Sequence, residues 1–243
     1  MIKINCDIGE REPDNKIDIE LMKYIHIANI ACGGHAGDEE TVAVFRQLAK
    51  ENNVEVAAHL SYPDRENFGR ASIDITIENL KKSLDEQYKM MPDVKMVKFH
   101  GGLYNDCSSD SVLACHLCQW LLANGIKRII TPDKSELAKA AEASGLTVVP
   151  EAFAERRYDF NPETKLLSLV NRKKSYACIH DCDEAVEHSG NIVTDGFLNA
   201  VIELEDGSTK TEKIDIKAET ICIHSDSEIA IELALKLSQL MAS

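Results

Sequence analysis

The segment IANIACGGHAGDEETVAVFRQLAKENNVEVAAHL, residues 27–60, contains a complete strand–helix–strand unit. Residues 27–32 and 54–59 are short apolar runs, and residues 39–52 between them carry hydrophobic side chains at helical spacing. Short apolar strands that alternate with helices are typical of a parallel sheet with crossover helices. This segment therefore predicts the α/β class.

The same alternation continues on both sides of this unit. Further apolar runs predict strands over residues 2–6, 95–100, 128–131, 147–149 and 220–224. Helical spacing predicts helices over residues 76–90, 111–124, 134–143 and 226–241, and Asn124-Gly125 and Ser144-Gly145 fit the C-termini of two of them. Seven strands of this kind predict a closed or nearly closed (β/α) barrel of the TIM type.

The pattern loosens over residues 166–217. Within this stretch Asp206-Gly207 separates residues 200–205 from residues 213–216, which predicts a hairpin. Because neither a Pro/Ser/Gly-rich linker nor a repeat of fixed period is found, we expect residues 1–243 to form one barrel domain with an irregular excursion at 166–217.

Charge and composition exclude several classes of partner and of fold. The 243 residues are 44% hydrophobic and 28% charged, which excludes disordered and fibrous classes. Lys and Arg number 27 against 41 Asp and Glu, so the net charge is −14, a field that repels phosphate backbones and anionic lipid heads. We therefore expect neither nucleic acid nor membrane as a partner.

The sequence contains no apolar stretch long enough for a membrane span, and its first residues lack the apolar core of a signal peptide. We expect a cytoplasmic protein on this basis. Its eight cysteines should then stay reduced and pack as small hydrophobes, without disulfides.

Polar side chains gather at the C-terminal ends of the predicted strands. In a barrel these ends form the functional face, because the loops that follow them converge on one mouth. Four of the eight histidines lie at or just past such an end: His35, His59, His100 and His224. An isolated histidine there could be a hydrogen-bonded structural residue, but four beside Gly, Asp or Tyr favour a functional site.

Six of these segments, in unbroken order from about residue 4 to the C-terminal helix, resemble the motifs of the LamB/YcsF family, the family of 5-oxoprolinase A subunits. They are NCDIGE, ANIACGGHAGD, AHLSYPDRENFGR, VKFHGGLYND, EAFAERRYD and ICIHSDS. The resemblance implies a seven-stranded barrel related to the glycoside hydrolase/deacetylase superfamily. It also implies one component of the ATP-dependent enzyme that opens 5-oxoproline to L-glutamate together with partner subunits B and C.

The chemistry of lactam opening can be matched to these residues. ATP would activate the ring by placing a phosphoryl group on the lactam oxygen, after which water attacks the carbon. The site then needs a base for the water, donors for developing negative charge and an acid for the leaving nitrogen. We expect Asp7 and His59 to position or deprotonate water, and His35 and His100 to steady charge or protonate the nitrogen.

The substrate carries a carboxylate, so local cations must overcome the negative field of the protein. Arg70, Lys98, Arg156 and Arg172 are candidates. The predicted substrate-binding set comprises three of these cations and other polar residues of the strand ends: Glu10, Asn29, Asp38, Tyr62, Arg70, Lys98, Tyr104, Arg156 and His224.

No GxxxxGK[ST] motif is present, and Gly33-Gly34 and Gly101-Gly102 are too sparse for a phosphate loop. These pairs are better explained as tight turns in which a side chain would collide. We therefore expect ATP to bind mainly on a partner subunit or at a shared interface.

A divalent metal is the main alternative explanation of the histidines, with Asp7, His35 and His59 as candidate ligands. Against it, the H-x3-4-H spacing, with three or four residues between two histidines, is absent at His59. The segments Cys115–Cys118 and Cys178–Cys182 also have spacings that zinc could use, but packing is the simpler role for the first because it lies in a predicted helix.

Two other functions remain open. The chain could be a stand-alone hydrolase of amidase or deacetylase type, or a non-catalytic ligand-binding subunit of a complex.

Overall fold

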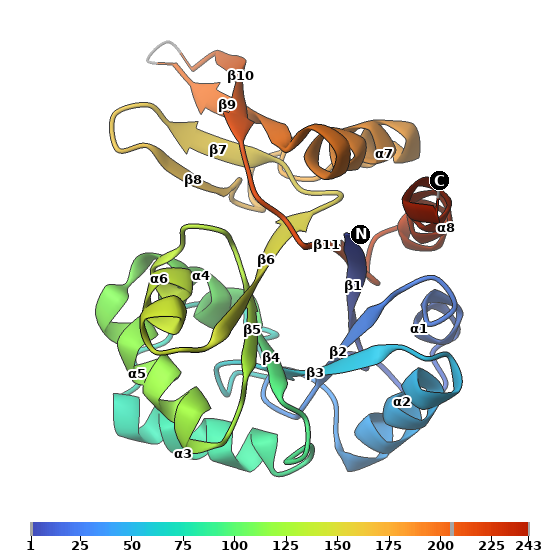
Figure 1. The fold of residues 1–243 in the computed structure, drawn as a ribbon, viewed down its shortest axis with the longest axis vertical. Coiled ribbons are helices and arrows are strands. Elements are labelled where there is room, and N and C mark those ends of the chain that lie inside the picture. The colour runs from blue at the N-terminus through green and yellow to red at the C-terminus, as the bar shows by residue number, and fades with distance from the viewer. Residues whose placement is uncertain (1, 205–206, 243) are drawn as a thin grey trace.

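Seven parallel strands close into a barrel in the computed structural model, which describes residues 2–204 and 207–242 (Figure 1). Each strand pairs with its neighbours in chain order, and the last pairs with the first, with His224 opposite Asp7. The predicted barrel is thus confirmed. Its strands are β1 (Lys3–Ile8), β2 (Ile27–Ala31), β3 (Glu55–Leu60), β4 (Met96–Phe99), β5 (Arg128–Thr131), β6 (Thr147–Phe153) and β11 (Thr220–His224).

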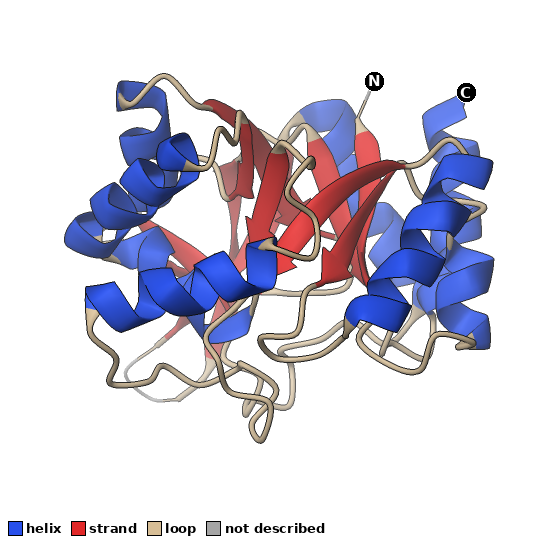
Figure 2. Ribbon diagram, turned by 90° about the horizontal axis from the view of Figure 1, so that it is seen from below, coloured by secondary structure: helices blue, strands red, loops and turns tan. Residues whose placement is uncertain are grey.

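Helices surround these strands, and the main hydrophobic core lies between the two layers (Figure 2). Side chains at the N-caps fix where several helices begin, because each accepts a hydrogen bond from a backbone N–H of the first turn. No helix in the described part of the chain is long and apolar enough to span a membrane. The helices are α1 (Lys16–Leu21), α2 (Glu39–Glu51), α3 (Ile77–Tyr88), α4 (Gly101–Ser109), α5 (Ser111–Ala123), α6 (Glu136–Ala143) and α8 (Ala230–Ala242).

Several element boundaries differ from those the sequence predicts. Strand β1 extends to Ile8 and β6 to Phe153, so Asp7 and Glu151 lie within strands. Helix α6 begins at Glu136, because Lys134 has a φ of 63° that a helix cannot contain. Helices α1 and α4 were not predicted, whereas the helix ends at Asn124-Gly125 and Ser144-Gly145 are confirmed.

The interior of the barrel changes from apolar to polar toward the strand ends. Because side chains alternate between the two faces of a strand, residues two apart point the same way. The lower layer is a small apolar cluster of Ile27, Ala57, Met96, Ile130 and Val149. Two residues further along four of these strands come buried polar residues: Asn29, His59, Lys98 and Glu151. The barrel interior is therefore apolar in its lower layer and polar next to the mouth.

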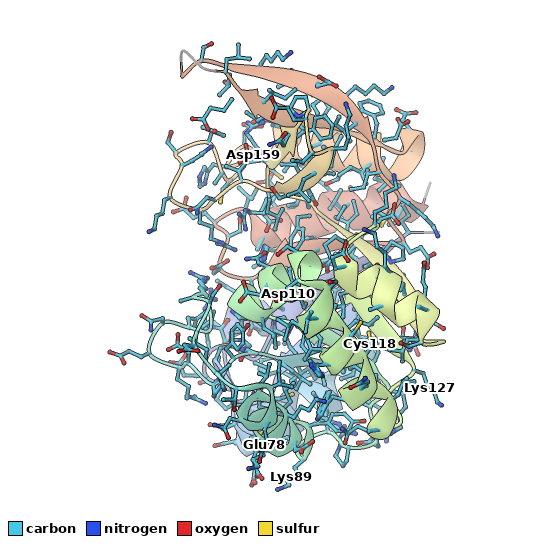
Figure 3. All side chains as sticks on the ribbon, turned by 90° about the vertical axis from the view of Figure 1, so that its left-hand side faces the viewer. Glu78, Lys89, Asp110, Cys118, Lys127 and Asp159 are labelled. Carbon is cyan, nitrogen blue, oxygen red and sulfur yellow. The ribbon has the colours of Figure 1, made fainter. Side chains whose placement is uncertain are left out.

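The excursion between β6 and β11 takes the place of a barrel helix and forms its own sheet, of strand order β10-β9-β7-β8, above the barrel in Figure 1. It starts at residue 158, earlier than the predicted residue 166. The predicted hairpin is confirmed as the antiparallel pair β9–β10, with Glu203 opposite Thr209, although Asp206 of the predicted turn lies outside the described residues. Its elements are β7 (Tyr158–Asn161), β8 (Leu166–Leu169), α7 (Cys182–Gly190), the π-helical turn η1 (Asn191–Asp195), β9 (Phe197–Glu203) and β10 (Thr209–Asp215). Figure 3 labels Asp159 on this sheet.

Candidate active site

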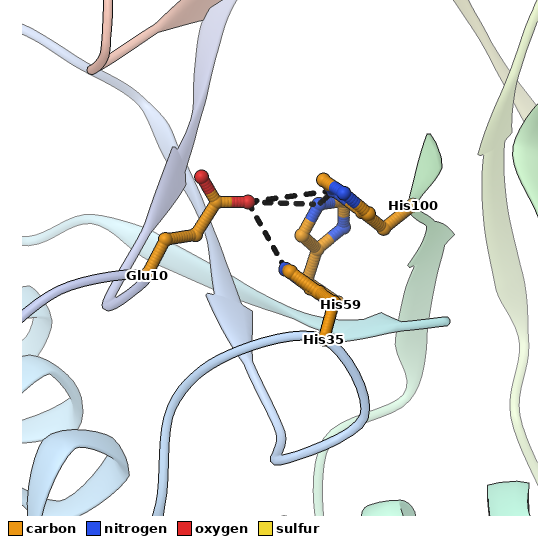
Figure 4. A group of neighbouring side chains, drawn as sticks. All are labelled: Glu10, His35, His59 and His100. Atoms are coloured by element: carbon orange, nitrogen blue, oxygen red, sulfur yellow. Dashed lines mark hydrogen bonds and ion pairs between the residues drawn. The ribbon is translucent and has the colours of Figure 1, made fainter. Parts of the chain in front are cut away.

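Acidic and imidazole side chains from four neighbouring strands meet at the mouth of the barrel (Figure 4). Asp7 lies near the end of β1 and Glu10 just beyond it, while His59 lies in β3. His35 follows β2 and His100 follows β4. All except Glu10 are buried, and the Glu10 side chain is only 11% exposed. The prediction that Asp7, His35, His59 and His100 meet at the barrel mouth is thus confirmed.

Glycines in the turns allow this close approach. Gly101, directly after His100, has a φ of 54°, and a Cβ there would lie 2.4 Å from the carbonyl oxygen of Gly69. A Cβ on Gly34, directly before His35, would lie 2.4 Å from Ser61 Oγ. The prediction that these glycine pairs permit tight turns is confirmed.

Each of the five side chains lies close to at least one of the others. His59 Nε2 is 3.3 Å from Asp7 Oδ2 and 3.8 Å from Glu10 Oε1. Glu10 Oε1 is also 3.0 Å from His35 Nε2 and 3.4 Å from His100 Nδ1. The rings of His35 and His100 are stacked, with centroids 3.7 Å apart. One oxygen of Glu10 therefore faces three imidazoles.

Backbone carbonyls determine which ring nitrogens carry hydrogen. His59 Nδ1 donates to the carbonyl oxygen of Lys98 (3.1 Å), and His100 Nε2 donates to that of Phe68 (3.0 Å). Since a carbonyl can only accept, the other nitrogen of each neutral ring carries a lone pair. These two nitrogens, His59 Nε2 and His100 Nδ1, face each other at 3.0 Å.

Burial keeps two of the imidazoles neutral. It holds the pKa of His35 well below its usual range, and the charge of His59 lowers it further. Burial together with the neighbouring His35 and His59 lowers the pKa of His100 to about 2. Near neutral pH both rings are therefore uncharged and suited to act as ligands or hydrogen-bond partners rather than as cations.

The two carboxyl groups are shifted in opposite directions. Burial alone would raise the pKa of Asp7, but His59 and Lys98 hold it well below its usual range. Burial raises the pKa of Glu10, and the nearby charge of Asp7 adds to the effect. Carboxyl groups whose pKa values are pushed apart are suited to different roles, as base and acid.

Lys98 lies inside the barrel beneath the mouth, where its ammonium group has a complete set of partners. Nζ is 3.1 Å from Asp7 Oδ1, 2.8 Å from Glu151 Oε1 and 3.0 Å from Cys222 Sγ. Burial would lower the pKa of Lys98, but Asp7, Cys222 and Glu151 raise it well above its usual range. Lys98 is buried and its charge is paired within the protein, so its role in binding a substrate carboxylate stays a prediction.

Two further predicted substrate ligands belong to this interior layer. Asn29 is fully buried and donates from Nδ2 to Asp7 Oδ1 (2.9 Å). Tyr104 donates from Oη to Glu151 Oε2 (2.8 Å). Their observed contacts orient the carboxylates around Lys98.

His224, the fourth strand-end histidine, is paired separately from the other three. Its Nδ1 forms an ion pair with Glu155, and its ring stacks on Phe153 with centroids 5.5 Å apart. It nevertheless borders the site, because one ligand atom each of His224, Cys222 and Asp7 lie within 4.8 Å of one another.

Three other predicted substrate-binding candidates have protein partners. Asp38 caps α2 by accepting the Thr41 N–H (2.8 Å). Tyr62 Oη donates to Asp106 Oδ2 (2.9 Å). Arg70 pairs through Nη2 with Asp226 (2.9 Å), and its side chain is 45% exposed.

Arg156 is buried in the excursion and donates to the carbonyl oxygens of Val170 (2.8 Å) and Ala177 (3.3 Å), so its role in substrate binding stays a prediction. Its guanidinium holds the excursion together. Arg172 is exposed.

Two arginines that the sequence reasoning missed line a cavity of about 410 Å³ at the mouth. Arg11 and Arg65 line it together with Glu10, His35 and Phe68. Arg11 immediately follows the first strand-end motif and Arg65 lies inside the third, so the motifs themselves were the available signal.

Two groups of side chains among the described residues could hold a metal ion. Glu10, His35, His59 and His100 form one group, and the other is the group of Asp7, Cys222 and His224. Neither includes the cysteine pairs considered from the sequence. Cys118, labelled in Figure 3, is buried in α5 whereas Cys115 is exposed, so the two thiols do not share an environment.

Comparison with known proteins agrees with the motifs. The profile of the LamB/YcsF family matches residues 2–243. Curated relatives named as A subunits of 5-oxoprolinase include those of Pyrococcus abyssi (34% identity over 99% of this chain and 93% of the relative), Thermococcus sibiricus (36%, 97% and 92%) and Staphylococcus carnosus (34%, 98% and 94%). The crystal structure of a lactam utilization protein from Thermus thermophilus is similar, with a TM-score of 0.80 at 25% identity, over 99% of this chain and 96% of that one.

Proposed function

Because this chain belongs to the LamB/YcsF family, we propose that it is the A subunit of an ATP-dependent 5-oxoprolinase, which opens 5-oxo-L-proline to L-glutamate. The names of its curated relatives and the lactam utilization protein of similar fold support this assignment. The observation that carries it is the buried pair of Asp7 and His59, 3.3 Å apart at the barrel mouth beside Glu10.

The reaction needs activation because the lactam is stabilised by amide resonance. Transfer of the γ-phosphoryl group of ATP to the lactam oxygen would make the ring carbon electrophilic and leave ADP. Water then adds to that carbon, and the carbon–nitrogen bond breaks as the nitrogen takes up a proton, which leaves glutamate as an acyl phosphate on its side chain. A second water hydrolyses this acyl phosphate to glutamate and phosphate. Base and acid groups held in place lower the barrier to these proton transfers.

The proposed roles follow from protonation state. Asp7 is held ionised, so with His59 it positions the water and accepts its proton. Glu10 has a raised pKa and is the group that protonates the nitrogen. His35 Nε2 lies 3.0 Å from Glu10 and can donate to the charge that develops there, while the lone pair of His100 Nδ1, 3.4 Å away, can accept from protonated Glu10 and orient it.

The substrate carboxylate is assigned to the cavity at the mouth. Arg11 and Arg65 supply positive charge on its lining, against the net charge of −14 of the whole chain. A planar guanidinium can bind a carboxylate through two hydrogen bonds.

Subunits B and C complete the proposed enzyme. The sequence of this chain contains no phosphate loop, so we assign most of the nucleotide contacts to a partner subunit or a shared interface. Because the reaction consumes ATP, the proposal places the complex in the cytoplasm.

The test is reconstitution with subunits B and C from the same source. We expect glutamate from 5-oxoproline and ATP only in the full mixture, and we expect Asp7→Asn to reduce turnover by about 10²–10⁴-fold without preventing assembly. Amide hydrolysis by this chain alone would instead support a stand-alone hydrolase. Unchanged turnover in Asp7→Asn and His59→Ala would support a non-catalytic role in the complex.

A further inference from the structure

We infer that Glu10, His35, His59 and His100 form a binding site for one divalent transition-metal ion of the zinc type. The inference goes beyond the proposed activity, whose steps above assign no metal to these four residues. It starts from the pair of ring nitrogens that face each other across the mouth, His59 Nε2 and His100 Nδ1.

Two nitrogen lone pairs that face each other at this distance repel unless a positive charge lies between them. The carbonyl oxygens of Lys98 and Phe68 take the N–H groups on the far sides of the rings. The facing nitrogens of the neutral rings then present lone pairs to each other at 3.0 Å. Either a proton or a metal ion must lie between them.

Outer hydrogen bonds of this kind are typical of histidines that bind metals. A metal-ligating imidazole usually donates its other N–H to a carbonyl or carboxylate, which fixes the ring and its tautomer. His59 and His100 both have that arrangement. His35 does not, because within residues 2–204 and 207–242 its buried Nδ1 has no hydrogen-bond partner. His59 and His100 are therefore the two best supported ligands.

The spacing of the ligand atoms fits a small ion. Bonds of about 2.0–2.2 Å to a tetrahedral centre place neighbouring ligand atoms about 3.3–3.6 Å apart. Glu10 Oε1 lies 3.0 Å from His35 Nε2, 3.4 Å from His100 Nδ1 and 3.8 Å from His59 Nε2. These separations need only small adjustments to surround one ion.

The donor set points to a transition metal. Imidazole nitrogen with one carboxylate suits zinc, cobalt and neighbouring ions, whereas magnesium and calcium prefer all-oxygen sites. Within the described residues, the side-chain nitrogens that approach Glu10 all belong to histidines, so no lysine or arginine fills the position. With an ion bound, Glu10 would be an ionised ligand and could not also protonate the nitrogen, so the two roles of Glu10 belong to different states of the site, and Asp7 would be left to accept the proton of the water.

The test uses the complete chain without a histidine tag. After chelator treatment the protein is dialysed against equimolar Zn²⁺ or Co²⁺, and the bound metal is measured by elemental analysis. Four-coordinate Co²⁺ also reports its ligands through its visible absorption. We expect one ion per chain, and a cobalt spectrum of a site with nitrogen and oxygen ligands rather than thiolates.

Single substitutions identify which residues bind the ion. His59→Ala and His100→Ala should each weaken binding by more than the roughly 10–100-fold cost of losing an outer hydrogen bond. Glu10→Gln, which preserves side-chain shape, should also weaken it and serves if the histidine variants fold poorly by circular dichroism. His116→Ala on α5, next to Cys115, is the matched control and should bind like the parent.

A parent protein that retains no ion, or variants at His59, His100 and Glu10 that bind as tightly as the parent, would overturn the inference. So would loss of the ion in His116→Ala. Because binding is measured without partners or substrate, either result would leave the proposed oxoprolinase activity standing.

Discussion

The barrel holds two charged clusters in contact with each other, and they differ in where their positive charge comes from. The interior cluster surrounds Lys98, whose ammonium group lies 3.1 Å from Asp7 and 2.8 Å from Glu151. The mouth cluster places Glu10 against three imidazoles, of which His35 and His100 are kept neutral by burial. The first cluster carries its own cation, and the second presents donor atoms that could receive one.

This difference indicates a division between stability and function. A buried ion pair with full hydrogen bonding is costly to break, because one charge is then left without a partner. Buried donor atoms that face one another contribute little to folding, and proteins retain such arrangements where the chemistry requires them. Asp7 contacts both clusters, since Oδ1 faces Lys98 and Oδ2 faces His59.

Replacing Lys98, the cation of the interior cluster, is expected to have the largest effect on stability. Lys98→Met leaves Asp7 and Glu151 buried without their counter-charge, and should lower the free energy of unfolding by about 3–5 kcal/mol. Urea denaturation measures this directly. Lys139→Met, which removes a surface pair with Glu136, is the control and should change stability by less than about 1 kcal/mol. Equal stability of the two variants would remove the distinction between the clusters.

Changing the mouth should affect activity more than stability. Glu10→Gln removes a carboxyl group that the proposal uses as the acid, so turnover by the complete enzyme should fall about 10²-fold or more. Its free energy of unfolding should stay within about 1 kcal/mol of the parent, because burial already disfavours the charged form. A loss of stability as large as that of Lys98→Met would contradict this reading of the mouth.

Replacing Arg65, which lines the cavity, should have a smaller effect than the two substitutions above, and this effect should be on substrate binding. Arg65→Met should raise the KM for 5-oxoproline about 10–100-fold, the cost of one charge-assisted hydrogen bond, with a smaller change in kcat. Steady-state kinetics of the reconstituted enzyme measure both constants. Arg46→Met is the matched control, because Arg46 pairs with Asp93 on the outer surface. An unchanged KM in Arg65→Met would mean that Arg65 does not bind the substrate carboxylate.

The smallest effect is expected at Arg70. Its pair with Asp226 is largely exposed, so Arg70→Met should cost less than about 1 kcal/mol in thermal or urea unfolding. Its KM should change less than that of Arg65→Met, because Arg65 rather than Arg70 lines the cavity. A larger increase in KM at Arg70 would restore the role first expected from the sequence.

The barrel and its mouth could be predicted because both follow from simple periodicities. Apolar runs separated by helical segments define seven strands, and polar residues at successive strand ends must converge once those strands are parallel. This reasoning correctly brought Asp7, His35, His59 and His100 together. The four-residue strands β7 and β8 were not predicted, because such short, partly exposed strands have no continuous apolar run.

Whether a side chain is buried inside the protein was harder to predict than which strand end it lies near. Lys98 lies two residues after the buried Met96 and therefore points inward, whereas its charge alone suggested contact with substrate. The partners of Arg156 could not be predicted for a related reason, since the carbonyl groups that accept its hydrogen bonds belong to the excursion, whose packing depends on distant segments. Local patterns do not specify such long-range partners.

Anomalous X-ray diffraction at the zinc absorption edge, on crystals grown with equimolar Zn²⁺, tests the contrast between the clusters most directly. The account predicts one peak about 2.0–2.1 Å from both His59 Nε2 and His100 Nδ1, and none beside Lys98. A crystal with no peak at the mouth, in which those two nitrogens still bond to each other directly, would contradict it.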